Sequence, residues 1–102
     1  MNEQDERHLT RMQDRLSMYA RGELSLATLI GDLEALMAAL TVASSSWRRS
    51  FHEHWGTLEQ VYAVTADRGE MKLDKDNAAL VDQTVKDLSV LVEDARSGRA
   101  ND

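Results

Sequence analysis

The chain has 102 residues, 42% hydrophobic and 29% charged, which suits one soluble globular domain with a single core. Its 18 acidic and 12 basic residues give a net charge of −6, which disfavours direct binding to a nucleic-acid backbone, because that needs a basic face. The absence of cysteine excludes disulfides and thiolate metal sites, while the absence of proline and the abundance of good helix formers favour an all-α fold.

Apolar residues recur at helical spacing in four segments. Residues 4–20 form the first, and Arg21-Gly22 follows it with a basic residue and a glycine, a combination typical of helix ends. The second helix is predicted to begin after Ser25, a good N-cap, and its wide apolar stripe runs over residues 26–40. Each segment therefore has local signals for its boundaries.

The third segment contains most of the aromatic residues. One of the three serines at 44–46 is expected to cap this helix, which is predicted to run to about Asp67, before Arg68-Gly69. One of its faces carries large side chains at intervals of three and four, and we expect these to form the centre of the core: Trp47, Phe51, Trp55, Leu58 and Tyr62. If Trp55 or Tyr62 were only half covered, it would be a natural anchor for a partner protein.

The fourth helix is predicted to be capped by Asp74 or Asp76. Its buried face is expected to contain Leu80, Thr84, Leu88, Leu91 and Ala95, widened by Val81, Val85 and Val92. From Arg96 onward the only apolar residue is an alanine, so we expect one domain over residues 1–96 and a disordered tail over 97–102.

Four amphipathic helices joined by short links predict antiparallel neighbours. The expected fold is therefore all-α, a four-helix antiparallel bundle or an irregular relative. The amino end lacks the apolar core of a secretory signal, and no apolar run approaches the roughly 18 residues that a membrane span needs. We therefore expect a cytoplasmic protein that does not bind membranes.

The residues that could support catalysis or metal binding do not form a recognisable site. His52 and His54 are two positions apart, which places them about 200° apart around a helix, so they cannot converge on one metal ion. Glu34, Glu53 and Glu59 occupy polar or boundary positions, where solvated carboxylates are expected. Nucleophile-elbow and phosphate-loop motifs are absent. We therefore expect no enzyme, no catalytic residue and no cofactor.

Two surface features indicate a partner protein instead. The outer face of the third helix carries small and polar residues around a mid-helix glycine, which would let another backbone approach closely, although an ordinary solvated face is the alternative. Acids also gather near the third connection, where a basic partner could dock, although capping explains one of them. The candidate partner-binding residues are Glu53, Gly56, Gln60, Asp67, Glu70 and Asp74.

Two segments, RGELSLATLIGDLEAL (21–36) and WRRSFHEHWGTLEQVYAVTADRG (47–69), resemble a pattern found in small acidic helical bacterial proteins. Some of these resemble immunity proteins of contact-dependent growth inhibition and related polymorphic toxin systems. The resemblance implies that the chain binds the carboxyl-terminal domain of one cognate toxin, often a nuclease, and blocks its active site or substrate entry. It transfers no catalytic residue and no contact motif.

The alternative is a helical interaction or homo-oligomerisation module, such as an adaptor or regulator, without a toxin partner. Exposed apolar residues such as Met18 and Val90 would then be covered by a different partner or by a second copy, in a homodimer.

Overall fold

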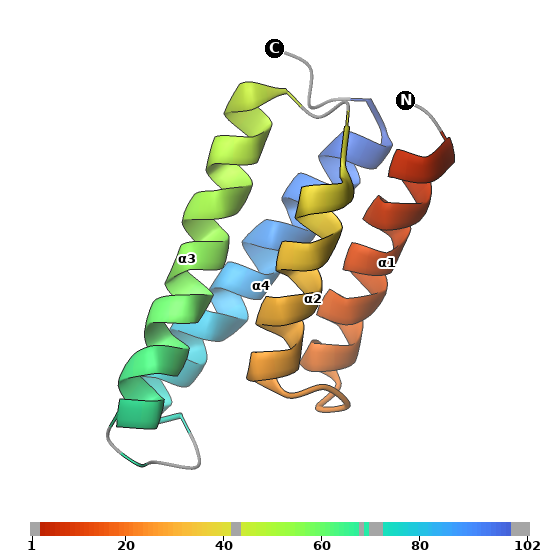
Figure 1. The fold of residues 1–102 in the computed structure, drawn as a ribbon. Helices are drawn as coiled ribbons and strands as arrows, with labels where there is room; N and C mark the ends of the chain where they lie inside the picture. The colour runs from red at the N-terminus through yellow and green to blue at the C-terminus, as the bar shows by residue number, and fades with distance from the viewer. Residues whose placement is uncertain (1–2, 42–43, 68, 70–72, 99–102) are drawn as a thin grey trace.

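The computed structural model describes residues 3–41, 44–67, 69 and 73–98. Within them the chain forms four α-helices, α1 (Glu3–Ala20), α2 (Leu26–Ala39), α3 (Ser45–Asp67) and α4 (Lys75–Arg96). Each runs antiparallel to the next, and α1 contacts α2 and α4 while α3 contacts the same two helices (Figure 1). The prediction of an all-α four-helix antiparallel bundle is confirmed.

The helix boundaries follow the signals read from the sequence. The Ser25 side chain accepts a hydrogen bond from the Thr28 N–H at 3.2 Å, and the Asp74 carboxylate accepts one from the Asn77 N–H at 2.8 Å. Of the three serines before Trp47, Ser44 is the cap, since its hydroxyl oxygen accepts the Trp47 N–H. These caps satisfy N–H groups that have no partner inside the helix.

The aromatic residues of α3 hold it against both neighbouring helices. Trp47 and Phe51 are buried and stacked, with ring centroids 5.3 Å apart. The Trp47 indole N–H donates to the Leu91 carbonyl of α4 at 2.8 Å, and the Trp55 indole N–H donates to the Ile30 carbonyl of α2 at 3.0 Å. Burying both rings therefore leaves neither N–H unsatisfied.

The prediction that Tyr62 lies in the core is wrong. Its side chain is 43% exposed, and Val61 (6% exposed) occupies the core instead. Tyr62 lies about two turns beyond Trp55, whereas α2 begins at Leu26, only about one turn from the Ile30 carbonyl that Trp55 contacts. The 23-residue α3 thus continues past the start of the 14-residue α2 (Figure 1), and Tyr62, near the end of α3, is therefore only partly covered.

The buried face of α4 is narrower than expected. Thr84, Leu88 and Ala95 are buried together with the three valines at 81, 85 and 92, as the pattern predicts. Leu91 is only partly buried, and Leu80 is 46% exposed, which contradicts its assignment to the core. Leu80 lies four residues before the buried Thr84 and so on the same side of α4, and its exposure therefore follows from its place near the beginning of α4, at the end of the bundle.

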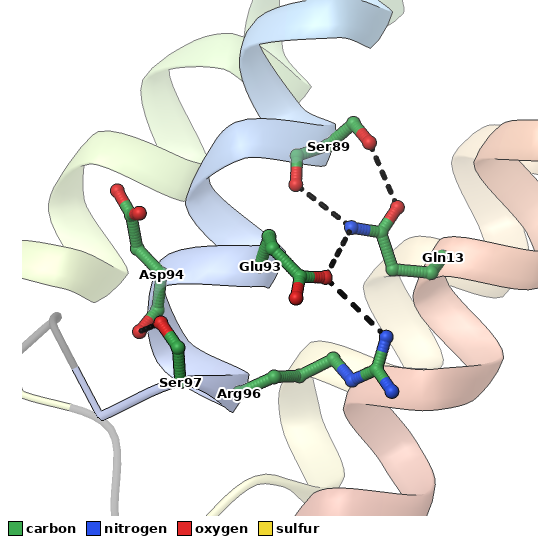
Figure 2. Close-up of polar contacts among 6 residues, drawn as sticks. All are labelled: Gln13, Ser89, Glu93, Asp94, Arg96 and Ser97. Atoms are coloured by element: carbon green, nitrogen blue, oxygen red, sulfur yellow. Dashed lines mark hydrogen bonds and ion pairs between the residues drawn. The ribbon is translucent and has the colours of Figure 1, made fainter.

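A polar contact between α1 and α4 supplements the apolar packing (Figure 2). The Gln13 side-chain amide donates to the Ser89 carbonyl at 2.8 Å, and the Ser89 hydroxyl donates back to the Gln13 amide oxygen at 2.8 Å. The same amide also reaches Glu93 at 3.5 Å, and Glu93 pairs with Arg96 at 3.4 Å. Because two such reciprocal bonds require one alignment, they fix the register of α1 against α4.

The end of α4 lies close to the expected position. The helix ends at Arg96, and Gly98 adopts a left-handed backbone with φ +79°. Residues 99–102, most of the tail predicted as disordered, lie outside the described residues.

Candidate partner-binding surface

Four of the six candidate residues share the outward face of α3. Glu53, Gln60 and Asp67 are exposed, and Gly56 is partly exposed between them. Their spacing of three, four and seven residues places them on one side of the helix. Glu70 lies outside the described residues. Asp74 lies across the α3–α4 connection, exposed, with its carboxylate engaged in capping α4.

The mid-helix glycines are not required by packing within the bundle. A Cβ built on Gly56 of α3 or on Gly31 of α2 would meet no other atom within 4 Å, and neither residue has a positive φ. Glycine inside a helix costs about 1 kcal/mol relative to alanine. Both positions therefore leave open space on the outside of the bundle that a neighbouring molecule can approach.

Exposed apolar residues and carboxylates both occur at the α3–α4 end of the bundle, although Tyr62 and Val64, two positions apart, lie on different sides of α3. Tyr62 and Val64 lie within the last six residues of α3, and Leu80 lies within the first six of α4. All three are large hydrophobic residues that remain exposed. We name as the hairpin tip these residues together with the nearby carboxylates: Tyr62, Val64, Leu80, Asp67, Asp74 and Asp76.

The carboxylates of the hairpin tip differ in their effect on the helices. Asp74 and Asp76 lie at the N-terminus of α4, where the helix dipole favours negative charge. Asp67 is the last residue of α3, at the partly negative carbonyl end, and no basic residue occupies the last turn of α3. Asp67 is therefore unfavourable for α3 and is not explained by helix stability.

A small pocket lies between α2 and α3, which pack against each other less closely than the other neighbouring helices do. It has a volume of about 140 Å³ and is lined by Glu34, Met37, Phe51, His52 and Trp55. His52 stacks on Trp55, with ring centroids 5.5 Å apart. This pocket could not be predicted from the sequence, because it depends on how far α2 and α3 stand apart, which neither helix pattern reveals.

Within the described part of the chain, no three histidine, aspartate or glutamate side chains gather as a metal site. A hollow of about 440 Å³ alongside α1 is lined mainly by charged residues, including Arg11, Asp14, Arg15 and Arg21. Arg15 pairs with Asp32 of α2 at 3.3 Å, and Arg21 pairs with Glu23 at 2.7 Å. The hydrogen bond from Arg21 lowers the pKa of the Glu23 carboxyl, as expected for an exposed ion pair.

None of the helices in the described ranges is both long enough and apolar enough to span a bilayer. Comparison of the chain with family models, curated proteins and solved structures finds no match.

Proposed function

We propose that this chain is an immunity protein, which binds the carboxyl-terminal domain of a cognate toxin and covers its active site or substrate entry. The observation that supports this proposal is the hairpin tip, where exposed apolar side chains and carboxylates occur at the same end of the bundle. The toxin domain it suits is a nuclease, because a nuclease needs a basic cleft for its polyanionic substrate.

The two kinds of residue have separate tasks in such a complex. The carboxylates at positions 67, 74 and 76, together with the net charge of −6, attract a basic surface and speed its encounter. Tyr62 then provides an aromatic anchor that loses its remaining contact with water on binding. A standard interface of about 800 Å² per partner would use about an eighth of the 6387 Å² molecular surface.

The first test is purification of the tagged chain from the producing bacterium, with the bound protein identified by mass spectrometry. The expected partner is a stoichiometric carboxyl-terminal piece of a large secreted protein. Expression of that piece alone should be toxic, and co-expression of this chain should restore growth. Recovery of the chain without such a partner, or failure to protect against the piece, would contradict the proposal.

A second candidate function, homo-oligomerisation, is favoured by the outward face of α2. Most of its exposed residues, Ala27, Gly31, Ala35 and Ala38, are small and uncharged, and Glu34 is the one acidic residue exposed beside them. Two copies that each carry a charge of −6 repel one another, and a face with few charges allows close approach at a lower electrostatic cost than the rest of the surface. Sedimentation equilibrium tests this, because a dimer should dissociate in an Ala35→Glu variant, whereas a monomer at all concentrations would exclude it.

A further inference from the structure

The pocket between α2 and α3 has an apolar interior and an acidic mouth. Phe51 and Trp55 are buried core residues, and Met37 of α2 packs against the same core. His52 is exposed and continues the aromatic wall outward by stacking on Trp55. Because the Trp55 indole N–H is bonded to the Ile30 carbonyl, this ring is held in place, and the wall is formed before any ligand arrives.

The size of the pocket limits what can occupy it. Pockets for drug-sized ligands and cofactors have volumes of about 300–1,000 Å³. At about 140 Å³, this pocket holds less than half the lower value. It is therefore suited to a single side chain that a partner protein inserts, and a nucleotide or coenzyme would not fit.

The charges around the pocket determine which side chain suits it. Glu34 is exposed, and no ion pair or side-chain hydrogen bond joins it to another residue within the described ranges. No lysine or arginine lines the pocket. A cationic side chain with a long apolar stem therefore matches it, since the stem can pack on Met37 and Phe51 while the charge stays near Glu34.

Arginine meets these requirements better than lysine. Its planar guanidinium can stack on an aromatic ring, in this pocket that of His52. It can also form two parallel hydrogen bonds with one carboxylate, in this pocket that of Glu34. The ammonium group of lysine is more strongly hydrated and lacks the planar shape.

We propose that the α2–α3 pocket binds an arginine side chain of the partner protein. This rests on the proposed function in one respect, namely that the basic cleft of a toxin supplies the arginine. The pocket then forms a second contact region, separate from the hairpin tip, and it adds specificity for a planar cation to the general attraction between opposite charges.

The pocket can be tested on the isolated chain by NMR. The two tryptophans give two indole N–H signals, which a Trp47→Phe variant assigns. Titration with N-acetyl-arginine methylamide should shift the Trp55 signal, with a ~millimolar dissociation constant typical of one side chain, and leave the Trp47 signal unchanged. The citrulline analogue, which has the same stem without the charge, should bind about two- to fivefold more weakly.

Equal shifts with arginine and citrulline, or no selective shift of Trp55, would overturn the proposal. Glu34→Gln should also weaken arginine binding by about fivefold. The matched control is Glu6→Gln, which removes an exposed glutamate of α1, a helix that does not pack against α3. An equal effect of both variants would mean that only the net charge matters and would also overturn the proposal.

The NMR titration of the isolated chain tests the pocket whether or not a toxin partner is found. Selective arginine binding without any toxin partner would support arginine binding by the pocket and contradict the proposed function. Conversely, a toxin whose affinity is unchanged by Glu34→Gln would support the immunity function and show that the pocket lies outside the interface with the toxin domain.

Discussion

The carboxylate of Asp5, near the start of α1, accepts hydrogen bonds from both the backbone N–H and the hydroxyl of Thr41, at 3.1 and 3.2 Å. Asp5 is only 1% exposed, and Thr41 follows the end of α2. The preceding carbonyl, that of Leu40, accepts a hydrogen bond from Arg48 of α3. The Thr41 N–H and the Leu40 carbonyl, just after the end of α2, are thus bound by α1 and α3 respectively, so that three helices are joined at this point.

Replacement of Asp5 by alanine should therefore destabilise the bundle. Hydrogen bonds to a charged group contribute about 1.5–3 kcal/mol, and we expect a loss in this range for Asp5→Ala, measured by urea unfolding. Asp5→Asn keeps one acceptor oxygen and should lose less. If both variants unfold at the same urea concentration as the parent chain, the Asp5 contact contributes nothing to stability.

The aromatic core of α3 allows a second prediction. Phe51→Ala and Trp47→Ala should each lower the free energy of unfolding by about 3–5 kcal/mol, because both side chains are buried. That is a large part of the 5–15 kcal/mol that stabilises a typical domain. Val90→Ala, which truncates an exposed residue of α4, is the control and should change stability by less than about 0.5 kcal/mol. Near-native melting of both aromatic variants would contradict the structure.

Whether a feature of the fold can be predicted depends on how far apart in the sequence the interacting residues lie. The sequence predicts Ser25 as a cap and leaves Asp74 and Asp76 as alternatives, of which Asp74 is the cap, because a cap acts within one turn of its own helix. The burial of Trp47, Phe51, Trp55 and Leu58 followed from helical spacing alone. The contact between Asp5 and Thr41 joins residues 36 positions apart, and no local sequence pattern predicts it.

The errors have the same physical origin. Helical spacing assigns Tyr62 to the apolar face correctly, but whether that face is covered depends on where α2 begins. The difference in length between the two helices was visible in the sequence and would have been the signal. For the candidate site, the sequence predicts which residues share the outer face of α3 and that acids gather near the third connection, whereas the exposure of Tyr62 and Leu80 and the α2–α3 pocket depend on how different helices are placed.

The neighbours Val61 and Tyr62 provide a paired test of this explanation. Val61→Ala removes buried contacts and should cost about 2 kcal/mol of stability. Tyr62→Ala should cost less than about 1 kcal/mol, yet reduce affinity for the toxin domain by at least about 2 kcal/mol if Tyr62 anchors the complex. Calorimetric unfolding and binding titration measure the two effects. A larger stability loss for Tyr62→Ala than for Val61→Ala would show that the exposure of Tyr62 is misassigned.

Tyr19, in the last turns of α1, should make stability depend on pH in alkaline solution. Burial raises the pKa of its phenol above the usual 10.0, and the Asp82 carboxylate raises it further. The folded chain therefore keeps this proton at a pH where the unfolded chain loses it. The resulting stabilisation is complete below the unfolded pKa and is lost as the pH rises from about 10 through the folded pKa.

The measurement for Tyr19 is urea unfolding between about pH 8 and about pH 11. Lysines also titrate there, so the informative quantity is the difference between the parent chain and Tyr19→Phe. That difference should favour the parent chain most below about pH 10 and shrink at higher pH. Asp82→Asn should make the change smaller. A difference that stays constant with pH would mean that the pKa of Tyr19 is the same in the folded and unfolded chains.

Asp67 allows stability and binding to be separated. Because its carboxylate lies at the carbonyl end of α3, Asp67→Lys should stabilise the chain by about 0.3–1 kcal/mol. The same substitution reverses one charge of the hairpin tip, and it should slow association with the basic toxin domain, most strongly at low salt.

Asp76→Lys is the matched control, since it reverses a charge at the same tip but lies in the first turn of α4, where it should destabilise. Urea unfolding and stopped-flow association measure the two effects. If both variants slow association while only Asp67→Lys gains stability, then Asp67 serves binding at the expense of its helix. An association rate that Asp67→Lys leaves unchanged at low salt would place the residue outside the interface.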